Sequence, residues 1–379
     1  MQKNRSGLYF LLLGTVASVV GIFIFSYSQV ILAEIQGYDT AMAKRADLPR
    51  LEKPKAIIVK GLYLTAYSAS SPKKRAEIID LIKQTELNSV VIDIKDYSGN
   101  ILYNTNVPLV KKLKTNNPLI KNIGSVIQDF KQAGIYVIAR QTVFQDPALA
   151  QAMPSWAITT SGGGLWKDYK GLSWVDPTLP EVWKYNMSIA KEAIRLGFDE
   201  INFDYVRFPS DGNIKTAVYA KLQGDKAETM SDFYQYVHKQ LKDQPAYTSF
   251  DLFGLVLEAH DFDMNIGQKL NSALDTVDYI CPMTYPSHYP SGHLQFSNPA
   301  DHPYEVVHNG LLQSESVMQA AAHSKLRPWV QAFNLGAVYD ADKISAQIRA
   351  IEESKYTAGW ILWNAANRYT NAGLKAEDS

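Results

Sequence analysis

The chain has 379 residues, of which 46% are hydrophobic and 20% charged, a composition typical of a folded protein with a sizeable core. Lysine plus arginine and aspartate plus glutamate both number 38, and this zero formal net charge argues against a nucleic-acid-binding protein. The single cysteine, Cys281, excludes an internal disulfide and a zinc site built from several cysteines.

The N-terminal segment is predicted to be a transmembrane helix. Residues 7–33 contain no charge, and about 27 residues are enough to cross a hydrocarbon core of about 30 Å. Lys3 and Arg5 precede this run, so the positive-inside rule makes residues 1–33 a cytoplasmic tip with a signal anchor and places the rest outside the cytoplasm. A cleaved signal peptide, which would give a secreted form, is the alternative. Residues 34–55 are polar and mixed, and are expected to form a stalk.

Short apolar runs alternate with longer amphipathic stretches through residues 56–370, followed by a tail over 371–379. Eight runs are predicted to be strands: 61–67, 89–95, 135–141, 200–206, 249–258, 277–285, 328–334 and 359–364. Helical periodicity occurs between them, for example at 73–86, 123–133, 180–196, 231–241, 267–274 and 342–354. Eight such α/β units predict a closed (β/α)8 TIM barrel. An open doubly wound sheet is the alternative, but the glycine-rich phosphate turn that it often carries is missing.

The predicted connections differ in length between the two ends of this barrel. Helix-to-strand connections are tight, whereas the strand-to-helix connections 142–179, 207–230 and 286–303 are long. Functional sites of TIM barrels lie at the carboxyl ends of the strands, where these long loops gather. The site is therefore expected on that face.

Charged residues lie near the ends of the second and third predicted strands. Asp93 and Lys95 are expected to share a strand face by two-residue alternation, with Asp96 at the start of the loop. A charge in an apolar strand must be paired or functional, so an internal Asp–Lys ion pair is the alternative to a substrate-binding role. Arg140 ends the third strand, where it could bind a substrate hydroxyl or keep a catalytic carboxylate ionised.

The fourth predicted strand carries the sharpest catalytic candidate. Alternation places Asn202 and Asp204 on one face, and Arg207 follows just beyond. An aspartate at a barrel strand end with a positive partner can act as a nucleophile or stabilise charge. A purely structural Asp–Arg pair is the alternative.

The fifth predicted strand is followed by several acids. Glu258, Asp261 and Asp263 compete for the role of general acid, and spacing does not choose among them. Neighbouring barrel strands lie about 4.8 Å apart, so carboxylates at the ends of strands four and five could approach the roughly 5–5.5 Å separation found in retaining glycosidases.

Aromatic and amide side chains supply candidate sugar contacts. Trp166 and Trp174 lie in the long loop after the third strand, where they could form sugar platforms or pack a lid. Tyr285 follows the sixth strand, and Trp363 and Asn364 end the eighth. Each of these residues has a place in the core as its alternative role.

The sequence contains no HExxH, GxSxG, P-loop or GxGxxG motif, so no cofactor or metal is expected. His288, His293, Asp301 and His302 share one loop, however. A metal-dependent hydrolase or deacetylase therefore stays open as an alternative.

Several sequence blocks together resemble a bacterial family of glycoside hydrolases with a TIM-barrel domain. The blocks are KGLYLTAY at 60–67, VVIDIKD at 90–96 with Ser98-Gly99, 136–140, Gly164-Leu165-Trp166, WVDP at 174–177, FDYVRFP at 203–209, Ile266-Gly267-Gln268, PMTYPSHY at 282–289 and GWILWNA at 359–365. The resemblance covers about residues 56–370 and implies a barrel, an envelope location and a hydrolase-like upper face. The family pattern carries an acid near Asp263, whereas Glu258 is not clearly part of it. No substrate is implied.

The sequence thus predicts a membrane-anchored glycoside hydrolase that acts on a cell-envelope or extracellular polysaccharide by two-carboxylate chemistry. Asp204 is the expected nucleophile or charge stabiliser, and Glu258 or Asp263 is the expected general acid. A non-catalytic carbohydrate-binding or wall-scaffolding barrel is the second hypothesis. The oligomeric state is not indicated.

Overall fold

The computed structural model of the chain describes residues 52–377. The expected membrane anchor over residues 1–33, and almost all of the expected stalk, lie outside these residues. Within the described part of the chain, no helix is both long and apolar enough to cross a membrane.

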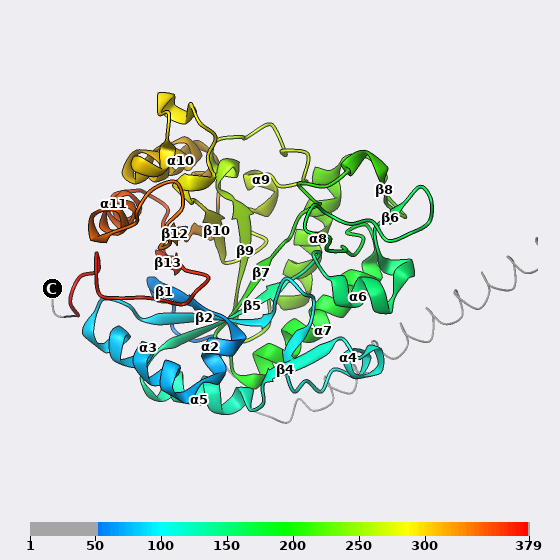
Figure 1. Cartoon of the computed structure of the whole chain (residues 1–379), viewed down its shortest axis with the longest axis horizontal. Helices are drawn as coiled ribbons and strands as arrows, with labels where there is room; N and C mark the ends of the chain where they lie inside the picture. The colour runs from blue at the N-terminus through cyan, green and yellow to red at the C-terminus, as the bar shows by residue number, and fades with distance from the viewer. Residues whose placement is uncertain (1–51, 378–379) are drawn as a thin grey trace, which may run out of the picture.

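Eight parallel strands surround the centre of the molecule (Figure 1). They are β1 (Val59–Leu64), β2 (Ser89–Lys95), β5 (Tyr136–Thr142), β7 (Glu200–Asp204), β9 (Tyr247–Phe253), β10 (Tyr279–Met283), β12 (Trp329–Gln331) and β13 (Gly359–Trp363). Each strand pairs in parallel with the next, and β13 pairs with β1. The sheet is therefore closed, and the predicted (β/α)8 barrel is confirmed.

The closure of the barrel depends on a glycine. Gly359 begins β13 opposite Val59 of β1 and has a φ of +97°. A Cβ atom at this position would lie 1.8 Å from the Val59 carbonyl oxygen. Because glycine alone accepts both this φ and this approach, the last strand can meet the first here.

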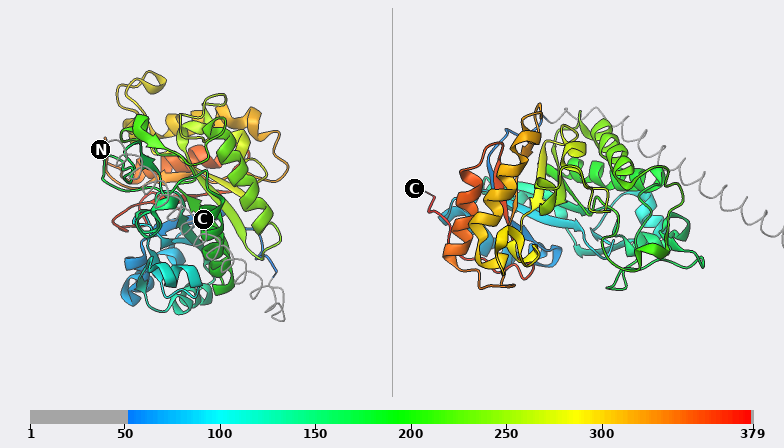
Figure 2. Two further views of the ribbon diagram at one scale, coloured as in Figure 1. Left: turned by 90° about the vertical axis from the view of Figure 1, so that its right-hand side faces the viewer. Right: turned by 90° about the horizontal axis from the view of Figure 1, so that it is seen from above.

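Helices cover the outside of the barrel (Figures 1 and 2). The larger ones are α3 (Pro72–Gln84), α5 (Ile123–Gln132), α7 (Pro180–Leu196), α8 (Lys226–Leu241), α10 (Pro303–Met318) and α11 (Ala341–Glu352). The predicted helix over 180–196 has the bounds of α7, which begins at Pro180 and ends at the left-handed Gly197. The helix predicted over 267–274 is reduced to α9 (Leu270–Ala273).

The strand-to-helix connections carry additional elements, as their lengths indicate. The first two connections hold α2 (Ala66–Ser70), β3 (Ile101–Tyr103), α4 (Pro108–Leu113) and β4 (Asn116–Ile120). The connection after β5 contains α6 (Pro147–Ala152) and β6 (Thr159–Thr160), and β6 pairs with β8 (Ala217–Val218) from the connection after β7. The short β11 (Lys325–Leu326) precedes β12 and pairs with β10. Two long loops are thus joined beside the barrel (right in Figure 1).

The fifth barrel strand ends earlier than the sequence pattern indicates. The predicted strand 249–258 is β9, which ends at Phe253, and a 3₁₀ helix over Gly254–Leu257 follows. The apolar residues of this short helix continue the hydrophobic run of the strand, which is why alternation misplaced its end. The upper rim of this strand is therefore formed by Asp251 and Phe253, not by Glu258.

The expectation that Asp93 and Lys95 share a strand face is wrong. The register with β5 shifts between these two residues, and such a bulge turns the following side chain to the other face. Lys95 points out of the barrel, where its Nζ lies 2.7 Å from Asp146 Oδ2 and donates to Asn186 of α7. Asp93 stays inside the barrel.

The barrel interior is polar at the bottom and at the top. At the bottom, Arg327 Nη1 donates to both carboxylate oxygens of Glu200 at 2.8 and 2.7 Å. The middle layer is mainly apolar and includes Val91, Ile138 and Ile361. The described part of the chain begins at the bottom of the barrel. There Lys53 forms an ion pair with Asp278, which directly precedes β10. The carboxyl ends of the strands lie at the opposite end.

Candidate active site

One buried guanidinium connects three barrel strands at the top. Arg140 of β5 donates from Nη1 to Asp93 Oδ1 of β2 at 2.6 Å, and from Nη2 to Asp204 Oδ2 of β7. Burial by itself lowers the pKa of Arg140, but the carboxylates of Asp204 and Asp93 outweigh it and raise this pKa well above its ordinary value. The guanidinium therefore stays charged and orients both carboxylates.

A third carboxylate, Asp251 of β9, completes this cluster. Its Oδ1 accepts hydrogen bonds from Trp329 Nε1 at 2.7 Å and from Asn202 Nδ2 at 2.8 Å. Its Oδ2 lies 3.7 Å from Arg140 Nε. Burial, and then repulsion by Asp204, raise the pKa of Asp251 well above its ordinary value, although Arg140 opposes this. Burial and the neighbouring carboxylate thus favour the neutral form of Asp251.

Aromatic rings fix the position of this polar cluster. Tyr63 of β1 donates its hydroxyl to Asp93 Oδ2 at 2.5 Å and stacks on Trp363, with ring centroids 4.0 Å apart. The Arg140 guanidinium carbon lies 5.0 Å from the Trp363 ring centroid. Burial raises the pKa of Asp93, and the contacts with Arg140 and Tyr63 oppose this shift.

Two adjoining cavities open above the cluster. One has a volume of about 300 Å³ and is lined by Asp204, Asp251, Arg207, Tyr285 and His288 among others. The other has a volume of about 600 Å³ and extends over the loops after β1 and β2. Four residues line both cavities: Arg140, Lys170, Tyr205 and Trp363. The shared lining makes them parts of one elongated site.

Exposed aromatic rings line the larger cavity. Tyr67 is 76% exposed and Tyr97 is 59% exposed, and both contribute to its wall. Flat amphipathic rings at a cavity wall suit the apolar faces of sugar rings. The sequence did not single out either tyrosine.

The residue after Asp204 has a strained backbone. Tyr205 has a φ of +53°, which is unusual for a residue with a side chain. This conformation lets its backbone N–H donate to Asp204 Oδ1 at 2.5 Å, and the Tyr205 ring lines both cavities. Strain of this kind is common at functional sites.

The structure brings together most of the predicted site residues. Asp93, Arg140 and Asp204 form the charged cluster described above. Four further predicted residues lie outside this cluster but line the cavities: Asp96, Arg207, Tyr285 and Trp363. Asp96 Oδ1 also accepts hydrogen bonds from the backbone and hydroxyl of Ser98.

The two predicted general acids lie elsewhere. Glu258 follows the 3₁₀ helix after β9, and its Oε1 lies 3.5 Å from His293 Nε2. Burial raises the pKa of Glu258, which the proximity of His293 opposes. Asp263 accepts hydrogen bonds from the backbone of Asn265 and Gly267, so it stabilises a tight turn. Neither acid lines the two cavities.

Both predicted loop tryptophans pack inside their loop. Trp166 Nε1 donates to the Asn213 carbonyl at 3.0 Å, and Trp174 Nε1 donates to Asp168 Oδ2 at 3.1 Å. Their rings are buried and do not line either cavity. They hold the loop that presents Lys170 to the site.

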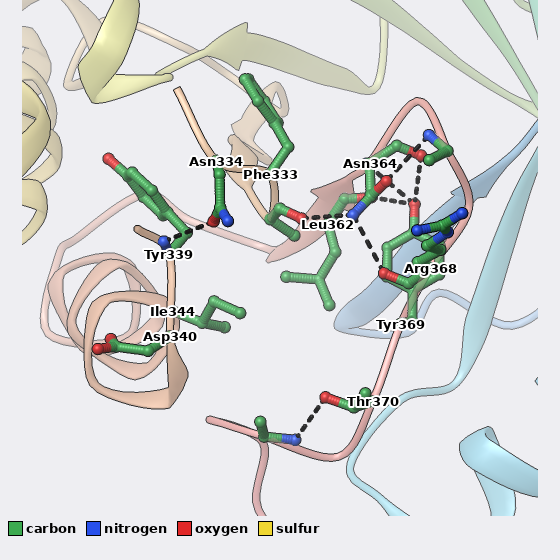
Figure 3. A pocket seen from close by; sticks show the side chains of 13 residues that line it. Phe333, Asn334, Tyr339, Asp340, Ile344, Leu362, Asn364, Arg368, Tyr369 and Thr370 are labelled. Atoms are coloured by element: carbon green, nitrogen blue, oxygen red, sulfur yellow. Dashed lines mark hydrogen bonds between the residues drawn. The ribbon is translucent and has the colours of Figure 1, made fainter. Parts of the chain in front are cut away.

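Asn364 belongs to a neighbouring depression of about 380 Å³ (Figure 3). Its amide donates to the carbonyls of Ala332 and Arg368, and its oxygen accepts from the Ala366 N–H. The figure shows hydrogen bonds of Asn364 that tie the strand end to the following loop. Asn364 thus shapes the loop after β13.

Sequence reasoning missed Asp251, because it placed the end of the fifth strand at Glu258. The signal that could have found it is the pattern Ser249, Asp251, Phe253, which alternates with the apolar residues of β9. Sequence reasoning also missed Tyr63 and Trp329, because an aromatic residue in an apolar strand is expected to be part of the hydrophobic core. Among residues 52–377, no three histidine, cysteine or acidic side chains are grouped so that they could hold a metal ion.

Residues 61–369 match the family described as "Putative glycosyl hydrolase domain". No curated protein matches the chain. Among solved structures, a hypothetical protein from Ruminiclostridium thermocellum ATCC 27405 is 35% identical, with 50% of this chain and 96% of that chain covered and a TM-score of 0.47.

Two further solved structures share the fold at low identity. The PgaB (BpsB) glycoside hydrolase domain from Bordetella bronchiseptica is 12% identical, with 81% of this chain and 94% of that chain covered and a TM-score of 0.56. The α-galactosidase TtGalA from Thermus thermophilus, in complex with stachyose, is 13% identical, with coverages of 86% and 65% and a TM-score of 0.53.

Proposed function

The chain belongs to the family described as "Putative glycosyl hydrolase domain", and on this premise we propose that it hydrolyses glycosidic bonds with Asp251 as general acid and Asp204 as the ionised partner. The observation that carries the proposal is the contrast between these two carboxylates at one guanidinium. Asp204 receives a charged hydrogen bond from Arg140, whereas Asp251 receives only the neutral donors Trp329 and Asn202.

The hydrogen bonds of Asp251 fit a protonated carboxyl group. Both donors point at Oδ1, which is how the carbonyl oxygen of a neutral acid is satisfied. The proton then belongs on Oδ2, on the side of Arg140 Nε. A neutral acid in this position can donate its proton to a glycosidic oxygen in the cavity.

In the proposed reaction Asp251 transfers protons and Asp204 stabilises the positive charge on the sugar. Asp251 Oδ2 transfers its proton to the leaving oxygen as the bond from this oxygen to the anomeric carbon breaks. Asp204 stabilises the positive charge that develops on the sugar, either through space or by forming a bond to the anomeric carbon. Water then adds to the anomeric carbon and gives up one proton to Asp251; where Asp204 has bonded to this carbon, that bond breaks in the same step. Arg140 holds Asp204 in position through its hydrogen bond.

The spacing of the carboxylates favours an enzyme over a non-catalytic binding barrel. Asp204 and Asp251 both approach nitrogens of one guanidinium, so they lie within the separation of about 10 Å that glycoside hydrolysis uses. A barrel that only binds sugar would gain nothing from placing a neutral acid and an ionised carboxylate together.

The cavity and the fold support an oligosaccharide substrate. The two connected cavities, with Tyr67 and Tyr97 on one wall, offer room for more than one sugar unit. Two solved structures with this fold are a glycoside hydrolase domain and an α-galactosidase in complex with stachyose. We infer a polysaccharide or oligosaccharide of the cell envelope or its surroundings as the substrate.

The proposed membrane anchor is compatible with an open site. The described chain begins near the bottom of the barrel, where Tyr247 donates to the Pro54 carbonyl at 3.0 Å. An anchor that precedes this point would join the barrel at the end opposite the cavities. We propose that the barrel lies outside the cytoplasm on this single anchor.

The test is a screen of envelope and extracellular polysaccharides with the wild type, Asp251→Asn and the matched control Glu258→Gln. Asp251→Asn is expected to lower kcat by about a hundredfold or more, whereas Glu258→Gln keeps activity because it lies outside the cavities. Equal turnover by Asp251→Asn and the wild type would contradict the mechanism. Saturable binding of a glycan without turnover by the wild type would instead favour a non-catalytic barrel.

A further inference from the structure

Arg207 is a buried cation without an ionic partner. It lies in the loop three residues after β7 ends at Asp204, and it is 8% exposed. Its only hydrogen bond within residues 52–377 runs from Nη1 to the Phe208 carbonyl at 3.0 Å, and no carboxylate of that part of the chain forms an ion pair with it. Burial lowers the pKa of Arg207, and the charges of Tyr205, Asp204, Asp211 and Asp168 oppose this shift only in part.

The other buried basic residues all have carboxylate partners. The pairs are Arg75 with Asp129, Lys95 with Asp146, Arg140 with Asp93 and Asp204, and Arg327 with Glu200. Burying a charge is costly unless it is paired. Arg207 differs from these residues because it has no carboxylate partner within residues 52–377. An anionic partner from outside these residues would offset the cost of burying its charge.

Aromatic rings hold the Arg207 guanidinium in place. Its central carbon lies 5.1 Å from the ring centroids of Trp174 and Tyr205, and 4.7 Å from that of Phe253. These contacts stabilise the cation, but they leave its in-plane N–H donors unused, apart from the one on Nη1 that binds the Phe208 carbonyl. A planar fork that is oriented in advance matches the two oxygens of a carboxylate.

The nearby acidic side chains are engaged elsewhere. Asp168 accepts from the backbone of Lys170 and Leu172 and from Trp174 Nε1. Asp211 accepts from the Tyr169 N–H. Neither forms an ion pair with Arg207, although the charges of both act on its guanidinium at longer range.

The unpaired cation faces the proposed catalytic pair. Arg207 lines the cavity of about 300 Å³ together with Asp204, Asp251 and Lys170. The exposed Lys170 has no ion-pair partner within the described residues and adds a second positive charge at the mouth. An anionic group in this cavity would lie next to the bond that Asp251 protonates.

We propose that the substrate is an acidic glycan, and that Arg207, assisted by Lys170, binds the carboxylate of a sugar unit next to the cleaved bond. This inference rests on the proposed hydrolase function and names its substrate class. A singly charged carboxylate fits better than a phosphate dianion, because the cavity already contains the carboxyl groups of Asp204 and Asp251. The carboxylate belongs either to a uronic acid or to an acidic ether substituent of a neutral sugar.

Binding is measured by calorimetry in an Asp204→Asn background, which prevents turnover. The probes are oligogalacturonate, a glucuronic-acid oligosaccharide and a muramic-acid oligosaccharide, each with a copy whose carboxyl groups are reduced to alcohols. At least one acidic probe is expected to bind, and its reduced copy about tenfold more weakly or worse. The uronate and muramate probes distinguish the two sources of the carboxylate.

The decisive variant is Arg207→Gln, with Arg349→Gln as its control. Arg349 lies exposed on α11, so its substitution changes the net charge equally at a remote position. Arg207→Gln is expected to weaken binding of the acidic probe about tenfold or more and to leave binding of the reduced copy unchanged. Arg349→Gln is expected to change neither affinity. The Tm of Arg207→Gln is expected to stay equal or to rise, because an unpaired buried cation is removed.

Two outcomes would overturn the inference. One is the absence of saturable binding for every acidic probe, and the other is equal affinity for acidic and reduced probes in the wild-type site. If neutral glycans are cleaved and Arg207→Gln cleaves them normally, the acidic subsite is wrong while the hydrolase function stands. If acidic probes bind through Arg207 but no glycan is cleaved, the subsite stands and the hydrolase function is wrong.

Discussion

Arg140 and Asp251 approach each other without forming a hydrogen bond. Arg140 Nε lies 3.7 Å from Asp251 Oδ2, and this Nε has no hydrogen-bond acceptor within residues 52–377. The same guanidinium donates to Asp204 and to Asp93 through its other nitrogens. Three buried carboxylates thus share one cation, so full ionisation of all three would leave excess negative charge. Asp251 accepts no hydrogen bond from a charged donor, and its pKa is raised well above the ordinary value by burial and by Asp204.

The different roles of Asp251 and Asp204 predict that the kcat values of their variants depend differently on the leaving group. Asp251→Asn is expected to recover most of its lost kcat on aryl glycosides with dinitrophenolate leaving groups, since these depart without a proton. Asp204→Asn lacks the charge that stabilises the sugar and stays at least about a hundredfold slow on both substrates. Steady-state kinetics on a matched aryl series measures the difference. Identical leaving-group dependence for the two variants would contradict the assignment.

The raised pKa of Asp251 also predicts a pH-dependent stability. Because the folded state holds this proton more tightly than the unfolded chain does, the free energy of unfolding falls as pH rises above about 4, the usual aspartate pKa, toward the folded pKa. Asp251→Asn removes this loss. Its Tm is expected to exceed that of the wild type at pH 8 and to match it near pH 4. Thermal unfolding across this range, with the exposed Asp211→Asn as control, tests the sign.

Removal of the Arg140 cation is expected to lower the free energy of unfolding. Arg140→Met leaves Asp93, Asp204 and Asp251 together without a counter-ion, and breaking a buried ion pair typically costs about 3–5 kcal/mol. The loss of unfolding free energy is expected at pH 7 and should shrink toward pH 4 as the carboxylates become protonated. Urea unfolding at both pH values measures this change. Arg207→Met, which removes an unpaired cation, is the contrasting variant and should not destabilise the protein.

The exposed tyrosines of the larger cavity are expected to act on substrate affinity. Tyr67→Ala and Tyr97→Ala remove sugar-facing rings and should each raise KM about three- to tenfold, with little change in Tm because both rings are exposed. Tyr169 is also exposed, at 82%, but lines neither cavity. Tyr169→Ala is therefore the matched control. Equal KM values for all three variants would exclude a platform role for Tyr67 and Tyr97.

The sequence was sufficient for the architecture because the signals of a barrel are local. Apolar strands recur eight times along the chain, with amphipathic helices between most of them, and three of the strand-to-helix connections are long. The start of α7 at Pro180 and its end before Gly197 follow from the conformations that these two residues favour. The membrane anchor rests on local composition as well and stays a prediction.

The sequence located only part of the site. Asp93, Arg140 and Asp204 were found because each interrupts an apolar strand near its end. Asp251 does the same, but the apolar 3₁₀ helix after Phe253 extends the hydrophobic run and hid the end of β9. The interpretation of Asp93 and Lys95 failed at a bulge, which alternation along one strand does not reveal.

By itself, the sequence determined the barrel and pointed to three members of the charged cluster, since hydrophobic periodicity and strand ends depend on neighbours along the chain. Only the tertiary structure decided which acid faces Asp204 and which cation lacks a partner. Asp251 and Asp204 lie 47 positions apart, and Arg207 is unpaired because the acids near it bind the backbone of another loop. Such pairings depend on distances across the barrel, where the closed sheet brings remote side chains together.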